Sequence, residues 1–334
     1  MLEYLIRRLG IGVLTLVVIT FLIMALIRNM PGDPIKMLAA GGQEEGRVEN
    51  RANAELMEMM RKSYGLDKPW YIGYWTWMGN VVQGDLGRSY YDQKPVTTRI
   101  GERIGATLSL SLISIVLIYV VSIPLGIYAT ARNGRWQEQL LSSFLYMLYS
   151  FPALVMALYL ILLFSVKLDL LPLRGMRTDM PGDAWEHLGL FEKALDRFKH
   201  LVMPVFCYSY GGIAFYTRFV RSNLLEVVRQ DYVRTARAKG LSEPTVLFKH
   251  AFRNSLIPLV TLLGLALPGL LGGSVILEQI FSWPGIGRLF LEAILQRDYP
   301  VIMGVTFMFA VMVLIGNLLA DVLYAFVDPR ITYK

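Results

Sequence analysis

Side chains that commonly carry out chemistry are few in this sequence, and none is arranged as a catalytic site. The phosphate-binding pattern G-x-x-x-x-G-K-[ST] and the nucleophile pattern G-x-S-x-G of serine hydrolases are both absent. The histidines, His187, His200 and His250, lack the spacing of a metal site, and the single cysteine, Cys207, excludes a cysteine-based zinc cluster. We therefore expect a chain that is not an enzyme, does not bind ATP and holds no cofactor or metal.

One carboxylate, Asp321, is flanked on both sides by apolar sequence. An acidic side chain at membrane depth is by default a functional hypothesis, here as part of a gate. Asn317 lies four residues earlier on the same helical face, where it is a partner for a structural hydrogen bond. Because Asp321 lies close to the end of the last apolar segment, we favour the structural role.

Three prolines, Pro124, Pro152 and Pro268, interrupt long apolar segments. A proline inside a helix frees a backbone carbonyl and bends the helix, which is useful around a pathway. Packing between helices also tolerates such prolines. The sequence therefore leaves a gating role and a structural role open.

A tight turn is predicted for residues 281–287, which read FSWPGIG and include Trp283, Pro284 and Gly285. The turn lies between two apolar segments, on the side that we expect to face outward. It would shape an outer mouth or contact a delivery protein. A rigid turn with no further role is the alternative.

The most informative segment is the basic stretch 218–254. Apolar side chains at helical spacing, followed by Gly240, predict a helix that ends in a glycine cap. Ser242 can cap a second helix that carries Pro244 in its first turn. The hairpin is either a solvated loop that only fixes topology or a stiff element that docks into a groove of a partner protein. The apolar positions are Leu225, Val228, Tyr232 and Ala236.

Membrane-spanning helices have to position these residues. Of the 334 residues, 54% are hydrophobic and only 18% charged, with a mean hydropathy of +0.46, whereas a soluble domain carries about 25% charged residues. Six apolar segments predict an all-α polytopic membrane protein with six transmembrane helices. The first lies within residues 1–30, and the others at about 106–131, 140–166, 200–217, 255–277 and 299–327.

Lysine and arginine near the ends of the spans predict the orientation of the chain. With a cytoplasmic N-terminus, the whole net charge of +7 falls on the inner segments. The charge therefore reports topology, not a nucleic-acid partner, and both termini are expected in the cytoplasm. Residues 31–105 then form an extracytoplasmic region, the core 106–327 includes the outer loop 167–199 and the cytoplasmic loop 218–254, and 328–334 form a cytoplasmic tail.

Residues 231–241, DYVRTARAKGL, resemble the conserved cytoplasmic loop of binding-protein-dependent ABC import permeases. The general motif of that family is EAA, three residues and Gly, followed by I-x-L-P. Here RTA at 234–236 and HAFR at 250–253 replace these two parts, as is typical of the dipeptide and oligopeptide (Dpp/Opp-like, B-type) group, and 171–175 resemble its Yej-type branch. Further matches follow in order at 4–8, 31–34, 65–69, 84–89, 123–126, 281–287, 297–300 and 328–330.

The resemblance implies the ABC type I importer (MetI-like) permease fold, with the hairpin of 218–254 as a coupling helix. Such a helix sits in a cleft of a cytoplasmic ATPase subunit and moves with it, which requires a stiff element anchored by spans at both ends. ATP and Mg would be bound by those ATPase subunits. The residues implied to contact the ATPase are Asp231, Tyr232, Arg234, Thr235, Ala236, Arg237, Lys239, Gly240 and Leu241.

The resemblance also implies the partners. These are a second homologous permease subunit in a heterodimer, two ABC ATPase subunits and an extracytoplasmic solute-binding protein, assembled on the cytoplasmic (inner) membrane of a bacterium or archaeon. The expected function is the import of di- or oligopeptides, or related small solutes, by alternating access. The alternatives are a self-contained secondary transporter or channel, which would usually show ionisable groups near the bilayer midplane, and a membrane-embedded enzyme.

Overall fold

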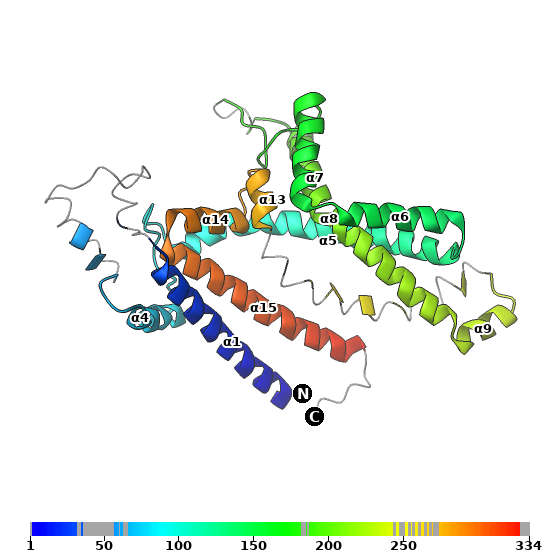
Figure 1. Ribbon diagram of the computed structural model, residues 1–334, viewed down its shortest axis with the longest axis horizontal. Helices are drawn as coiled ribbons and strands as arrows, with labels where there is room; N and C mark the ends of the chain where they lie inside the picture. Colours follow the sequence, from blue (N-terminus) through cyan, green and yellow to red (C-terminus); the bar gives the residue numbers. More distant parts are fainter. Residues whose placement is uncertain are drawn as a thin grey trace.

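The computed structural model describes residues 2–31, 66–181, 187–242 and 274–327, together with single positions or short runs among 35–62, at 185 and among 245–269. Every regular element in these ranges is a helix, and the β-bridge between Arg88 and Pro95 is isolated. The elements in chain order are α1 (Leu2–Asn29), α4 (Trp70–Val82), α5 (Val96–Ala131), α6 (Trp136–Ser150), α7 (Ala153–Leu160), the π-helix η1 (Ile161–Lys167), α8 (Leu190–Val228), α9 (Asp231–Ala238), α13 (Val275–Ile280), α14 (Ile286–Gln296) and α15 (Tyr299–Val327) (Figure 1).

Three described helices, α1, α5 and α15, are long and apolar enough to cross a membrane. A fourth span results if α6 and the continuous pair α7–η1 are counted together, although they meet at an angle of 93°. The single helix expected at 140–166 is therefore two helices. Phe151 is extended and Pro152 is the N-cap of α7, because a proline disfavours the helical conformation at the residue before it.

Pro124 behaves differently, because α5 continues through it to Ala131. Pro268 lies outside the described residues, as does most of the span expected at 255–277. The last residues of that expected span, 275–277, belong to the separate short helix α13. Ser274 caps α13 by accepting a hydrogen bond from the Leu277 amide at 3.3 Å.

The span expected at 200–217 is the middle of α8, a helix of 39 residues. By composition α8 is not among the candidate membrane spans of the described chain, since this stretch contains Tyr208, Ser209, Tyr210 and two glycines. This less apolar sequence is compatible with a span because α8 runs along α5, in the most extensive helix pair of the described structure. A helix that is enclosed by protein need not be apolar on every side.

Small residues allow α5 and α8 to approach closely. A Cβ on Gly126 of α5 would lie 2.6 Å from Val220, and one on Gly212 of α8 would lie 2.5 Å from Ile118. Real Cβ atoms do not come this close. At Gly126 the Thr217 carbonyl also lies 3.0 Å away, so a side chain there requires the helices to separate, whereas at Gly212 the obstacle is the end of the Ile118 side chain, which can move. Close approach through small residues is a common source of helix association in membranes.

Gly126→Leu is expected to destabilise the purified protein by about 1–3 kcal/mol, because it overpacks the α5–α8 interface. Gly105→Leu is the matched control on the same helix, because a Cβ there meets nothing within 4 Å. Thermal melting of the detergent-solubilised protein measures the difference. Equal melting temperatures for the two variants would show that the α5–α8 contact does not limit stability.

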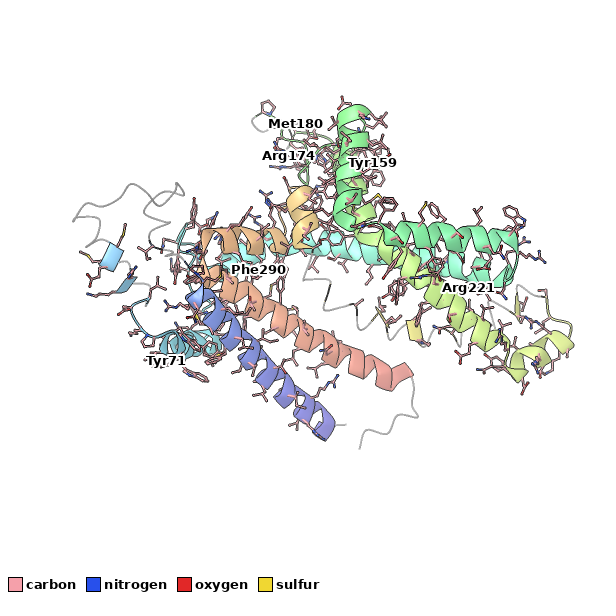
Figure 2. All side chains as sticks on the ribbon, viewed as in Figure 1. Tyr71, Tyr159, Arg174, Met180, Arg221 and Phe290 are labelled. Carbon is pink, nitrogen blue, oxygen red and sulfur yellow. The ribbon has the colours of Figure 1, made fainter. Side chains whose placement is uncertain are left out.

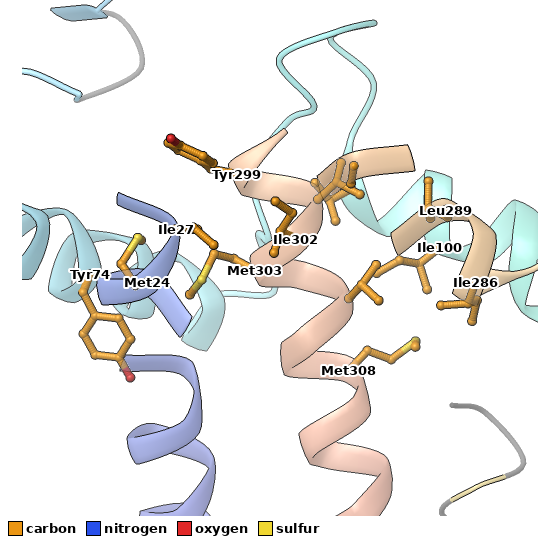
Figure 3. Packing of buried hydrophobic residues seen from close by; sticks show 14 residues of the cluster. Met24, Ile27, Tyr74, Ile100, Ile286, Leu289, Tyr299, Ile302, Met303 and Met308 are labelled. Atoms are coloured by element: carbon orange, nitrogen blue, oxygen red, sulfur yellow. The ribbon is translucent and has the colours of Figure 1, made fainter. Parts of the chain in front are cut away.

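A second packed region joins the end of α1 to the start of α15. Met24 of α1, Tyr74 of α4, Ile100 of α5, Leu289 of α14 and Met303 of α15 belong to one buried cluster (Figure 3). Five helices therefore meet around the point where α1 ends and α15 begins. The two helices run side by side from there, so the start of α1 and the end of α15 lie at the same end of the pair (Figure 1).

Candidate functional site

The chain turns sharply between α8 and α9. The first helix ends at Val228, and Gln230 is extended, with φ −75° and ψ 151°, as the N-cap of α9. The expectation of one helix with a continuous apolar stripe is therefore wrong. The break changes the register, so Val233 is fully buried in place of Tyr232, which is 38% exposed.

The predicted glycine cap is confirmed. Gly240 has φ +78°, a conformation that glycine adopts without a steric penalty. The Gly240 amide donates to the Arg237 carbonyl at 2.9 Å, and the Leu241 amide donates to the Ala236 carbonyl at 3.4 Å. These are the two hydrogen bonds of a Schellman motif, which ends α9 and reverses the chain.

The returning chain packs against α9. Val246 is fully buried and forms one cluster with Val233 and Ala236, against which Val227 of α8 also packs. The Val246 amide donates to the Ser242 carbonyl at 3.0 Å, as in a helical turn. Ala236 therefore lies inside the hairpin, so its place in the structure favours packing over contact with another protein.

The other residues predicted for the coupling loop lie on the exposed surface of the hairpin. Arg234 and Asp231 form an ion pair at 3.5 Å, with side chains that are 71% and 96% exposed. An exposed pair of this kind contributes little to stability. The hairpin thus presents a polar and mainly basic face on a packed interior. The residues of this exposed face are Asp231, Tyr232, Arg234, Thr235, Arg237, Lys239, Gly240 and Leu241.

The base of the hairpin is tied to the turn between α5 and α6. Arg221 of α8 donates to the Asn133 side chain at 3.0 Å, and its guanidinium lies 3.1 Å from the Glu138 carboxylate (Figure 2). Glu138 is only 6% exposed. No sequence pattern indicates this contact, since Arg221 and Glu138 are far apart in the chain. It joins the expected cytoplasmic loop 218–254 to the short loop 132–139 between the second and third expected spans, which the same orientation places in the cytoplasm.

At the other side of the molecule, the predicted tight turn is confirmed as a closed unit. Trp283 is 1% exposed and donates from Nε1 to the Ala106 carbonyl at 2.9 Å. The fully buried Glu278 carboxyl accepts from the Thr107 hydroxyl at 2.9 Å and from the Arg288 amide at 2.9 Å. A Cβ on Gly285 would overlap this carboxyl group, so glycine is required there. Pro284 lines an adjacent cavity.

Two further motifs of the sequence meet through Asp298. Its carboxyl group is 1% exposed and accepts from the Ser89 hydroxyl at 2.5 Å, from the Tyr90 amide at 3.0 Å and from the Arg99 guanidinium at 3.1 Å. The segments 84–89 and 297–300 are thus held together. Their role in the described structure is to fix the start of α15 against α5.

Asp298→Ala is expected to lower the stability of the protein by about 2–6 kcal/mol, because the Ser89 hydroxyl and the Tyr90 amide lose this acceptor and each unsatisfied buried group costs about 1–3 kcal/mol. Arg99 keeps an ion pair with Asp92 at 3.6 Å. Asp85→Ala is the control. The Asp85 carboxylate accepts from the Gly87 amide, at 2.8 Å in an exposed turn. The melting temperature of the purified protein reports both changes, and a small effect of Asp298→Ala would contradict the proposed clamp.

The remaining predicted residues lie near the last span. Asn317 lines a cavity of about 450 Å³ between α1 and α15, together with Arg8, Gly12 and Leu314. The side chain of Asp321 lies outside the described residues. A pairing of Asp321 with Asn317 stays a prediction.

Comparison with known proteins covers the full length of the chain. A family model described as the inner membrane component of binding-protein-dependent transport systems matches residues 122–333, and the model for the N-terminal part of such components matches 1–111. The oligopeptide transport system permease protein AppB of Bacillus subtilis (strain 168) is 40% identical over 334 residues, 100% of both chains. The glutathione transport system permease proteins GsiC of Escherichia coli (strain K12) and Shigella flexneri serotype 5b (strain 8401) are 37% identical over the same full length.

A solved structure shows the same fold. A chain of the MetNI methionine ABC transporter, in an inward-facing conformation, matches with a TM-score of 0.54 and 17% identity. The match covers 70% of this chain and 97% of that chain. The likeness concerns the MetI-like arrangement of helices alone.

Proposed function

Because this chain belongs to the family of binding-protein-dependent transport system inner membrane components, as the permease subunit of an ABC importer, we propose that it moves di- or oligopeptides into the cytoplasm. A solute-binding protein delivers the peptide from outside. Two ATPase subunits on the cytoplasmic side supply the energy, and they bind the ATP and Mg. A second, homologous permease subunit forms the other half of the pathway.

The full-length likeness to two permeases supports the substrate class. One relative is named for oligopeptides, and the other for glutathione, which is itself a small peptide. Both align with this chain from end to end, so no domain of either lacks a counterpart in this chain. A peptide is the substrate that the two names share.

The observation that carries the coupling role is the construction of the hairpin that α9 and the returning chain form. Its interior is packed with Val233, Ala236 and Val246, its turn is capped at Gly240, and its basic face is exposed. A stiff hairpin of this kind can transmit a displacement, whereas a solvated loop cannot. We therefore assign the exposed hairpin face to contact with an ATPase subunit.

The long helix α8 connects this contact to the membrane. At 1.5 Å per residue its 39 residues extend about 58 Å, and it packs along α5. When ATP closes the two ATPase subunits, α9 moves with them and α8 carries the motion into the spans. The pathway then opens outward to accept peptide, and hydrolysis returns it to the inward-open state.

The same proposal fixes the orientation in the inner membrane, with both termini and the hairpin in the cytoplasm. The net charge of +7 falls on these inner segments, as the positive-inside rule requires. The contact of Arg221 with Asn133 and Glu138 supports a common side for the two inner loops.

Reconstituted transport tests this function. Proteoliposomes that contain both permease subunits and both ATPases are expected to accumulate labelled peptide only with ATP and the solute-binding protein. Unlabelled di- and oligopeptides should compete for uptake, whereas a sugar or an opine should not. Solute movement by this chain alone would contradict the proposal, and competition by a non-peptide solute only would refute the substrate class.

A further inference from the structure

An arginine-rich cavity of about 600 Å³ lies beside the outer turn, and we refer to it as the arginine pocket. Its lining includes Arg174, Arg177, Arg197 and Arg288 but only one carboxylate, Asp179. Arg174 lies in the segment beside α7, far from the α9 hairpin (Figures 1 and 2). The pocket therefore lies on the face that the proposed orientation places outside the membrane.

Three of the four arginines have no acidic partner in the described part of the chain. Arg288 pairs with Glu292 at 2.8 Å and also donates to the Ser282 carbonyl at 3.1 Å. For Arg174, Arg177 and Arg197, no described carboxylate lies within the 4.0 Å that defines an ion pair. Like charges in one cavity repel each other, so an incoming anion would be bound favourably.

Two of these arginines are held in place by Trp185. The guanidinium carbons of Arg177 and Arg197 lie 4.8 Å and 5.2 Å from the centre of its ring. Trp185 in turn donates from Nε1 to Asp196 at 3.3 Å, and Asp196 accepts from the Thr178 amide and hydroxyl at 3.0 Å and 2.5 Å. Stacking on an aromatic face orders a guanidinium while its N–H groups remain available to an anion.

Asp196, which holds Trp185 in position, is ionised at neutral pH. Burial raises the pKa of Asp196, but hydrogen bonds from Thr178 and Trp185 outweigh it and hold the pKa below its ordinary value. The opposite wall of the pocket, formed by the outer turn, is also fixed to the 174–179 segment. The Gly175 amide donates to the carbonyl of the buried Phe281 at 2.8 Å. The pocket is therefore built in advance of any partner, between the 174–179 segment and the outer turn.

We infer that the arginine pocket is a carboxylate-binding site that receives an acidic side chain of the solute-binding protein when that protein docks. This assignment rests on the proposed function. The planar guanidinium groups match a carboxylate in shape and charge. The lining arginines of the 174–197 segment are exposed at the surface, so a protein that docks from outside meets them before any substrate is released.

The test uses the whole transporter in nanodiscs and measures association of its solute-binding protein at several salt concentrations. For Arg174→Gln/Arg177→Gln, the association rate constant at low salt is expected to fall about tenfold, because electrostatic steering is lost. The difference should shrink as salt rises. ATP hydrolysis without the solute-binding protein should stay at the wild-type level.

Lys68→Gln/Lys94→Gln is the matched control, because it removes the same charge from exposed outer positions away from the pocket. It should change association little, and an equal effect of both double variants would overturn the assignment. The pocket variant should bind more slowly to substrate-free and peptide-loaded solute-binding protein alike. If the pocket variant were impaired only with peptides that carry a free carboxylate, the occupant would be the substrate and the assignment would be overturned. If the impairment required anionic lipid, the occupant would be a lipid phosphate group and the assignment would likewise be overturned. If the wild-type transporter does not bind the solute-binding protein, the proposed function itself fails.

Discussion

Replacing Gly240 with isoleucine is expected to lower ATP-driven peptide uptake about tenfold, while the chain still inserts and assembles. Gly240 has φ +78°, and a Cβ there meets nothing within 4 Å. The cost is therefore backbone strain of about 1–2 kcal/mol rather than a clash, and about 1.4 kcal/mol corresponds to a factor of ten in an equilibrium. Uptake of labelled peptide into proteoliposomes, normalised to the amount of assembled complex, measures the effect.

Two variants separate backbone strain in the hairpin from other causes. Gly240→Asn should keep most of the uptake, because asparagine tolerates the left-handed conformation better than a β-branched residue does. Gly84→Ile introduces the same strain in the turn after α4, where φ is +84° and a Cβ also meets nothing within 4 Å. If Gly84→Ile reduced uptake as much as Gly240→Ile, or if the latter transported normally, the coupling role of the hairpin would be refuted.

Replacing Glu278 with alanine is expected to destabilise the complex strongly, by about 2–6 kcal/mol, because two buried donors lose their acceptor and each unsatisfied group costs about 1–3 kcal/mol. These donors are the Thr107 hydroxyl and the Arg288 amide. The outer turn around Gly285 would also lose the group against which it packs. The yield and the melting temperature of the purified complex report the loss.

Glu278→Gln is the informative companion. One amide oxygen can still accept from the Arg288 amide, and the amide nitrogen can donate to the Thr107 hydroxyl. An intermediate loss is therefore expected for glutamine. A melting temperature for Glu278→Ala within about 1 °C of the wild type would contradict the buried network, since 1 kcal/mol shifts the melting temperature by several degrees in small domains.

The parts of the structure that follow from local chemistry were predictable from the sequence. The glycine cap at Gly240 depends on one backbone conformation and its neighbours. The tight turn that contains Pro284 likewise follows from residues close together in the chain. A bend at Pro152 could be predicted from the sequence, but its angle of 93° could not. At this angle α7 packs against Met203 of α8 and Leu277 of α13, contacts between segments far apart in the chain.

The contacts that a single sequence did not reveal are long-range. Thr107 and Glu278 are 171 positions apart, and Ser89 and Asp298 are 209 positions apart. Each residue has an ordinary local context, so nothing in the sequence marks it as half of a buried pair. The arginine pocket has the same origin, because Arg174 and Arg288 come together only when the outer loop packs against the outer turn.

Cysteine cross-linking tests the central claim most directly. The only native cysteine, Cys207, is 4% exposed, so a Cys207→Ser background is suitable for an introduced thiol. Arg234→Cys, at a side chain that is 71% exposed on the hairpin, is predicted to cross-link to an ATPase subunit and to change in yield when ATP is bound. Arg174→Cys should give no such product. Labelling of Arg234→Cys by a membrane-impermeant reagent from outside intact cells, or no ATPase cross-link from any exposed hairpin position, would contradict the account.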